Sequence, residues 1–473
     1  MNRRKFLEFS GGSLFGLSFG GCLERTRTSG SDIKQTHPNI VFIMVDDLGF
    51  SDLGCYGGNK QGIKTPNIDR MAREGMRFTQ AYSGCTVCAP ARSTLMTGKH
   101  MGHTTVRGNT GGISLKDDDI TIAQVLKKAG YATGGFGKWG IGDVGTEGVP
   151  EKHGFDVFFG YYHQIHAHNY WTDYLWRNSG KVSMTGEKGT MARYTHNRIF
   201  NETVKFIKEN HDKRFFCYCP WTPPHGNYQL PDDEPASKEF KEKPWSDEAK
   251  VLAAMIRMID RHVGEVLQLL KDLDIDEDTM VFFCSDNGGY RALDDFFNSN
   301  GPLRGQKGTL YEGGLRVPLI VRSPGRIRPS SRSDLLCYFP DIMATVAELA
   351  EAIEHVPTAI DGISIVPTLA GKDGIQKRHK YLYWEYPKYD WAKHRYVPTG
   401  PQQAVRMGKY KAVRFTFKGT FELYDLSTDV SETTNIAAKH PDIIAKMQAI
   451  ASHAHEEPIP QIEPEMPEGK KFR

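Results

Sequence analysis

The stretch NIVFIMVDDLG, residues 39–49, decides the fold. Residues 40–45 are continuously apolar and rich in β-branched side chains, which is typical of a strand buried on both faces of a parallel sheet. Asp46 and Asp47 follow directly, and open α/β sheets place their binding crevices at the carboxyl ends of such strands. The stretch therefore predicts a central strand that delivers two carboxylates to a site.

Outward from this strand, apolar strand patterns alternate with helical ones. The helical segment 66–75 ends at Gly75, and a second one from Thr121 is stopped by Gly130, as glycine often does at a helix end. Such alternation predicts an α/β fold with a large, mostly parallel sheet sandwiched by helices. The further strands are expected at 132–136, 215–219 and 280–284, and the further helices at 194–209, 247–271 and 339–350.

The pattern changes after about residue 375, where short strands separated by turns predict a smaller antiparallel sheet. Pro441 would begin a closing helix that runs to His453. We therefore expect a catalytic α/β domain at 38–374 and a C-terminal α+β subdomain at 375–457, with 1–37 as export signal and tether and 458–473 as a tail. The strands of the smaller sheet are expected at 381–386, 403–406, 410–415 and 421–424.

The first residues are typical of a targeting segment. Arg3 and Arg4 precede an apolar, glycine-rich run at 9–21, which resembles a twin-arginine export signal. Cys22 follows two glycines, as at a lipoprotein cleavage site, so a cleaved signal and a lipid anchor on Cys22 are both open. Either alternative predicts an exported protein, periplasmic or at the cell surface, that touches a membrane only through that anchor.

The charge balance argues against a nucleic-acid-binding protein, and the cysteine spacing argues against a domain held by disulfides or zinc. Lys and Arg number 60 against 57 Asp and Glu, a formal net charge of +3, so no nucleic-acid partner is expected. Eight cysteines at irregular spacings form neither a disulfide framework nor a zinc motif. Any role of a single cysteine must come from its neighbours.

The most informative stretch is CAPARSTLMTG, residues 88–98. A lone cysteine is most often a small buried hydrophobe, and no histidine lies nearby in sequence to activate Cys88 as an ordinary nucleophile. The stretch nevertheless resembles the signature C-x-P-x-R, followed by x-x-L-x-T-G, of the type I (formylglycine-dependent) sulfatase family, in the alkaline phosphatase superfamily. Ala91 stands where many members have serine.

The resemblance implies that Cys88 is oxidised to formylglycine by a formylglycine-generating or sulfatase-maturating enzyme. It also implies that Arg92 braces the aldehyde hydrate, since a guanidinium can bridge two oxygens. Cys85 lacks the proline and the arginine at the required offsets and has no assigned role.

The same resemblance implies one metal ion. Asp46 and Asp47 match the family's first metal carboxylates, and Asp286 and Asn287 match the second pair, with formylglycine 88 as a further ligand. Hard oxygen ligands suit Ca²⁺, and Mg²⁺ is the alternative. For an isolated Asp-Asp or Asp-Asn pair, a turn with capping acids would be the simpler interpretation.

Cations and a histidine complete the implied site. Lys138 lies in GKWG, residues 137–140, and Lys307 in GPLRGQKGT, residues 301–309, and both match lysines that contact sulfate oxygens in the family. His225 follows two prolines and matches the histidine that protonates the departing alcohol. Outside this pattern, each lysine would be interpreted as a solvated side chain, and the histidine as a loop residue.

One position departs from the family. Many sulfatases carry a histidine directly after the Lys-Trp pair, whereas this chain has Gly140. The segment 161–171 carries three histidines, and His168 is the candidate for the missing base, with an aromatic and histidine cluster at the rim as the alternative. The spacing of these histidines does not match a helical zinc motif.

The implied function is hydrolysis of sulfate esters, expected on a sulfated small molecule or, preferably, a sulfated oligosaccharide. Two rivals are a phosphodiester or phosphonate monoester hydrolase of the same superfamily, and a non-catalytic sugar-binding relative. Comparing the turnover of sulfate esters with that of phosphodiesters distinguishes the first rival from a sulfatase. The mass of the peptide that contains residue 88 tests the second rival.

Overall fold

The computed structural model describes residues 37–459 except 111–112, 291–292 and 391–394. Cys22, nearly all of the expected export segment and most of the expected tail lie outside the described residues. None of the helices that are described combines the length and the apolar character needed to cross a bilayer.

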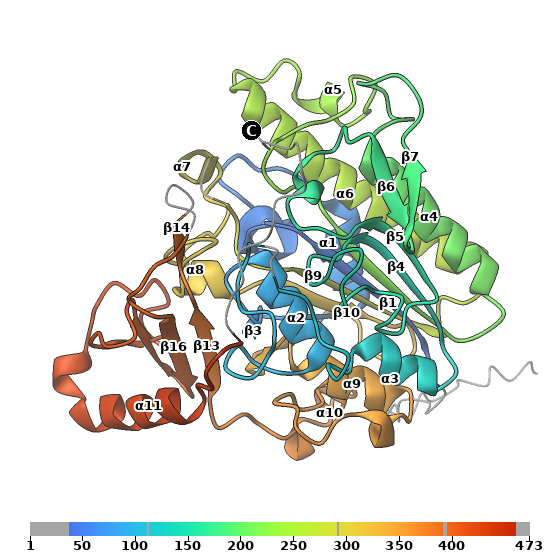
Figure 1. Cartoon of the computed structure of the whole chain (residues 1–473). Helices are drawn as coiled ribbons and strands as arrows, with labels where there is room; N and C mark the ends of the chain where they lie inside the picture. Colours follow the sequence, from blue (N-terminus) through green and yellow to red (C-terminus); the bar gives the residue numbers. More distant parts are fainter. Residues whose placement is uncertain (1–36, 111–112, 291–292, 391–394, 460–473) are drawn as a thin grey trace, which may run out of the picture.

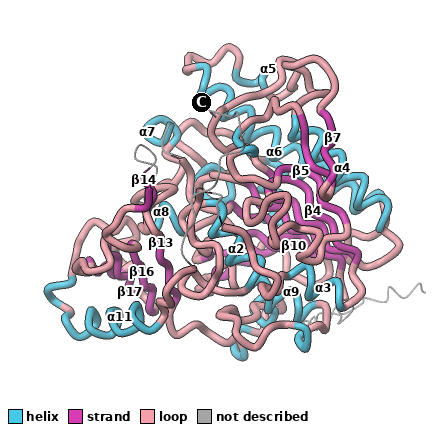
Figure 2. Tube along the Cα trace, in the orientation of Figure 1, coloured by secondary structure: helices cyan, strands magenta, loops and turns pink. Residues whose placement is uncertain are grey.

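A ten-stranded sheet forms the centre of the larger body, as the magenta strands in Figure 2 show. Its five middle strands, β9, β1, β8, β4 and β5, run parallel, and antiparallel pairings flank them on both sides. The predicted α/β class with a large, mostly parallel sheet is confirmed. In spatial order the strands are β11 (Ser331–Ser333), β2 (Met76–Phe78), β10 (Leu319–Arg322), β9 (Thr279–Ser285), β1 (Asn39–Val45), β8 (Phe215–Trp221), β4 (Ala132–Lys138), β5 (Val157–Tyr161), β6 (Tyr174–Arg177) and β7 (Gly180–Ser183).

Helices cover both faces of this sheet because its central strand is apolar on both sides. Ile40, Phe42 and Met44 of β1 pack in one core with helices α2, α3 and α9, whereas Val41 and Ile43 pack in the other core with α1, α4 and α6. The helices are α1 (Pro66–Glu74), α2 (Cys88–Thr97), α3 (Ile122–Lys128), α4 (Thr195–Asn210), α6 (Asp247–Asp272) and α9 (Asp341–Leu349).

A four-stranded antiparallel sheet and a closing helix form the smaller unit, drawn in red at the lower left of Figure 1. Tyr383 and Val405 on one face of its strands pack against helix α11, and Trp384 and Ala404 on the other face join a core of the larger body. Sheet and helix match the prediction. Their bounds are β13 (Leu382–Tyr386), β16 (Gln402–Met407), β17 (Tyr410–Arg414), β18 (Glu422–Asp425) and α11 (Pro441–His453).

The outer strands of the large sheet were not predicted from the sequence. They are three or four residues long, and β7 is largely exposed, so their length does not distinguish them from turns; β5, with five residues, was not predicted either. The remaining short elements are β3 (Ala81–Tyr82), β12 (Cys337–Tyr338), β14 (Tyr389–Asp390), β15 (Arg395–Tyr396), α5 (Ser237–Phe240), α7 (Asp294–Phe297), α8 (Glu312–Leu315) and α10 (Val366–Leu369).

Candidate active site

Four neighbouring parallel strands end at the same edge of the large sheet and carry most of the candidate residues. Strands β4, β8, β1 and β9 are adjacent and point the same way, so the segments that follow them converge. Lys138 is the last residue of β4, and His225 lies shortly after β8. The other two strands deliver the acids: Asp46 and Asp47 follow β1, and Asp286 and Asn287 follow β9.

The backbone at Asp47 lets two consecutive carboxylates face one site. Successive side chains of a strand point to opposite faces, so Asp46 and Asp47 would diverge if β1 continued. Asp47 instead has a φ of 65°, in the left-handed region that aspartate tolerates better than most residues. Its backbone N–H donates to Oδ1 of Asp286 at 3.2 Å. This turn accounts for the shared direction of the two side chains.

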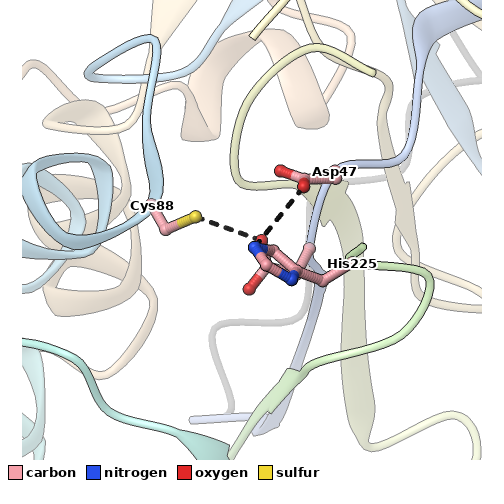
Figure 3. Close-up of side chains that lie close together, drawn as sticks. Asp47, Cys88 and His225 are labelled. Atoms are coloured by element: carbon pink, nitrogen blue, oxygen red, sulfur yellow. Dashed lines mark hydrogen bonds and ion pairs between the residues drawn. The ribbon is translucent and has the colours of Figure 1, made fainter. Parts of the chain in front are cut away.

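Cys88 is the first residue of α2 and is fully buried beside these acids. Its Sγ lies 3.2 Å from Oδ1 of Asp46, and Nζ of Lys307 lies 3.2 Å from the same sulfur. Figure 3 shows Cys88, Asp47 and His225 pointing toward one another from three separate elements. Burial and the charge of Asp46 raise the pKa of the Cys88 thiol, so the unmodified side chain is a protonated, weak nucleophile.

Three cations surround the three carboxylates. One guanidinium nitrogen of Arg92 lies 3.1 Å from Asp46 and 2.8 Å from Asp286, and Nζ of Lys138 lies 2.7 Å from Asp46. Nζ of Lys307 lies 2.6 Å from Oδ1 of Asp47. The three positive side chains thus balance the charges of the three carboxylates. These charged groups are largely shielded from water.

The pKa values of two acids diverge for a physical reason. Burial opposes ionisation of Asp46, but the neighbouring charges, that of Lys138 first and that of Arg92 among them, outweigh it and hold the pKa of Asp46 well below its usual range. Burial and the charge of Asp46 raise the pKa of Asp286 to about 7. Asp46 is therefore the carboxylate whose ionised form the surrounding cations stabilise.

The donor atoms fit a hard divalent cation. Ligand atoms of Asp46, Asp47, Cys88 and His225 all lie within 4.8 Å of one another. Asn287 donates from Nδ2 to Oδ1 of Asp47 at 2.8 Å, while its own Oδ1 is buried and has no hydrogen-bond partner among the described residues. A buried amide oxygen that lacks a donor, beside three carboxylates, is a ligand set of the kind that Ca²⁺ and Mg²⁺ prefer.

Two histidines lie against each other at the edge of the site. The rings of His168 and His225 stack with centroids 4.3 Å apart, and Nε2 of His225 lies 3.6 Å from Oδ2 of Asp47. Nε2 of His168 is buried and has no hydrogen-bond partner in the part of the chain that the structure describes. Burial lowers the pKa of His168, and burial together with Lys307 lowers the pKa of His225 to about 4, so both imidazoles are neutral here.

The structure thus brings together the residues that the family resemblance named, and it places His168, the candidate for the missing base, beside His225. The other two histidines of that segment point elsewhere: His166 bonds to Thr172, and Nδ1 of His163 accepts from the backbone of Ile165.

Gln164 and Asn109 belong to the site but were not predicted. The Ala89 N–H donates to Oδ1 of Asn109 at 3.0 Å, and Nε2 of Gln164 donates to the same oxygen. The Oε1 of Gln164 then faces Gly140, where an added Cβ would lie 3.3 Å from it. This oxygen is buried, and none of the described residues donates to it. Glutamine thus fills the space beside Gly140. In the sequence, the only indication of this arrangement was that position 140 lacks the family's histidine, and this does not identify the residue that occupies the space.

Comparisons with known proteins agree with this geometry. A family profile described as "Sulfatase" matches residues 38–353, and one described as "N-sulphoglucosamine sulphohydrolase, C-terminal" matches 306–457. The chain is 30% identical to arylsulfatase A of Homo sapiens, over 87% of each chain. It is 32% identical to N-acetylgalactosamine-6-sulfatase of Homo sapiens, over 85% of this chain and 76% of that one.

A solved structure extends the likeness to three dimensions. The crystal structure of Ps i-CgsB in complex with k-i-k-neocarrahexaose superposes with a TM-score of 0.77 at 26% identity, over 91% of this chain and 96% of that chain. The likeness therefore spans both the large and the small sheet.

Proposed function

Because this chain belongs to the sulfatase family of the alkaline phosphatase superfamily and is a sulfuric ester hydrolase, we propose that it removes sulfate from a carbohydrate, using a formylglycine made from Cys88 and one Ca²⁺ ion. The observation that carries the proposal is the position of residue 88. Its side chain lies between the Asp46 carboxylate and the Lys307 ammonium, each 3.2 Å from the sulfur. A nucleophile there would meet a sulfate group held by cations.

The carbohydrate part of the proposal is supported by relatives. The Ps i-CgsB structure contains k-i-k-neocarrahexaose, and a relative at 32% identity is named for a sulfate on N-acetylgalactosamine. The proposed export of the chain would also bring it to extracellular polysaccharides. Maturation by a formylglycine-generating enzyme is part of the same proposal.

The metal ion and the formylglycine would each supply one kind of chemistry. A cation held by Asp46, Asp47, Asp286 and Asn287 would offset charge on the sulfate oxygens. A hydrated formylglycine at position 88 would supply two hydroxyls, one to displace the alcohol from sulfur and one to expel sulfate afterwards.

The residues of the chain hold the reacting groups and move protons. Lys138 and Lys307 face the site and would bind non-bridging sulfate oxygens, whose charge grows in the transition state. Arg92 fixes Asp46 and Asp286 and also donates to the Lys138 carbonyl at 2.7 Å, which orients the end of β4. These contacts are made before substrate arrives, so little reorganisation is required during the reaction.

The two stacked histidines would divide the proton transfers. The negative charge of a bound sulfate favours the imidazolium form of His225, which then protonates the departing alcohol oxygen. We propose that His168, which is neutral and whose Nε2 bonds to none of the described residues, accepts the proton in the elimination step. This assigns to His168 the role that Gly140 leaves open.

Replacing His225 by alanine tests the general acid. We expect kcat on a sugar sulfate to fall by about 10² to 10⁴-fold, because an alkoxide is a poor leaving group without a proton. A nitrophenyl sulfate, whose phenolate leaves unaided, should lose much less. Steady-state kinetics on both esters measures the difference, and equal losses on the two would remove His225 from this role.

Turnover of different esters tests the function itself. We expect release of inorganic sulfate from at least one member of a panel of sulfated oligosaccharides, and much slower cleavage of a phosphodiester by the same preparation. Faster phosphodiester or phosphonate monoester cleavage would instead favour the rival hydrolase, which could use the same carboxylates.

A further inference from the structure

Two hollows meet at the free edge of the large sheet, away from the catalytic residues. One, of about 380 Å³, lies beside α1 and is lined by Arg73, Arg77 and Arg332. The other, of about 540 Å³, lies between the two sheets and is lined by Arg332 and Arg378 among others. Arg332 of the edge strand β11 lines both, so the two hollows adjoin at this residue, and together they are called the groove.

Two arginines face each other across neighbouring strands in this groove. Arg332 of β11 is in register with Arg77 of β2 in a parallel pair, so both side chains lie on the same face of the sheet. Like charges directly opposite each other destabilise a sheet. Arg77 is held by the Cys55 carbonyl and by the Tyr56 ring, and no described carboxylate forms an ion pair with either arginine. A bound anion would relieve this repulsion.

The groove concentrates positive charge. Seven arginine and lysine side chains line the two hollows against two aspartates; three of the seven form ion pairs with Glu312 or Asp425, and the other four have no such pair among the described residues. Arg73, Arg332 and Arg378 are exposed and make no side-chain hydrogen bond or ion pair with the described part of the chain. Of the acids, Asp69 is already bound to the Cys55 backbone and the Thr65 hydroxyl.

The other lining residues favour a sugar polymer over a nucleic acid. The hydroxyls of Ser331 and Thr79 donate to backbone carbonyls, and their oxygen atoms can accept from sugar hydroxyls. The lining includes no tryptophan, tyrosine or phenylalanine on which bases could stack.

We propose that this groove binds a sulfated polysaccharide chain outside the catalytic site, with sulfate groups on Arg332 and on arginines in both hollows. The choice of a sulfated polymer rests on the proposed function. Binding here would keep the enzyme on its polymer between cleavage events. It would raise the efficiency on long substrates and leave that on small sulfate esters unchanged.

The test compares dextran sulfate with neutral dextran by isothermal titration, on the full chain. The double variant Arg332→Gln/Arg378→Gln should bind dextran sulfate about tenfold more weakly, since two charge-assisted contacts are lost. The slope of log Kd against log salt should fall by about one per arginine. The control Lys128→Gln/Lys208→Gln removes the same charge from exposed sites on α3 and α4 and should bind like the parent.

Hydrolysis of a small sulfate ester is followed in parallel. It should be the same in all variants, so failure of the proposed catalytic function and failure of groove binding appear in different measurements. Equal weakening in both double variants, or equal binding of neutral dextran, would overturn the proposal. Tighter binding of DNA than of dextran sulfate through the same two arginines would assign the groove to nucleic acid instead.

Discussion

Replacing Cys88 by serine is expected to give an enzyme that completes at most one catalytic cycle. A serine hydroxyl at this position can accept the sulfuryl group, but it has no second hydroxyl with which to expel sulfate. We expect kcat for multiple turnover to fall by about 10⁴-fold or more. Sulfate release per mole of enzyme, followed over time, measures this, and the intact mass of the protein should show a sulfated adduct.

Cys85→Ser is the matched control. Cys85 is as buried as Cys88 and lies three residues earlier, but it points into an apolar core and contacts none of the catalytic acids in the described structure. The control should retain multiple turnover. Undiminished multiple turnover in Cys88→Ser would contradict the proposed chemistry.

Replacing Asp46 by asparagine is expected to destabilise the metal-stripped protein as well as to inactivate it. Asp46 is the carboxylate that Arg92 and Lys138 share, at 3.1 and 2.7 Å, and all three side chains are fully buried. Removing its charge leaves the Lys138 ammonium without an ionic partner among the described residues, in a fully buried site. We expect a loss of about 3 to 5 kcal/mol in the free energy of unfolding, measured by urea denaturation in the presence of a chelator.

Asp286→Asn separates charge pairing from metal binding. The Asp286 carboxylate is repelled by Asp46, and Arg92 keeps Asp46 as a partner when Asp286 is neutral. This variant should therefore lose activity but much less stability than Asp46→Asn. Equal destabilisation by the two variants would mean that the cations are not centred on Asp46.

Much of the fold could be predicted because its central elements are long and apolar. Residues 40–45 are buried on both sides, and the expected helix from Thr121 begins with a capping box to Gln124. The strands outside this centre are short, and their pairing depends on tertiary contacts. Strand β2, for example, is three residues long and lies between β10 and β11, more than 240 positions later in the chain.

The site was predicted only as a set of residues. The family resemblance named Asp46, Cys88 and Lys307, and no spacing in the sequence indicates that their side chains meet. The left-handed backbone at Asp47 and the contact of Gln164 with Asn109 depend on how separate loops close on one another. Such features follow from the assembled sheet edge and from no local pattern.

The proposal that Cys88 is converted to formylglycine can be tested by the mass of the proteolytic peptide that contains residue 88, taken from active enzyme. Conversion of the thiol to an aldehyde lowers that mass, and the aldehyde reacts with a hydrazide probe. We expect the aldehyde form, in a fraction that rises in proportion to specific activity across preparations. Fully active enzyme whose peptide carries only an unaltered Cys88 would contradict the proposal.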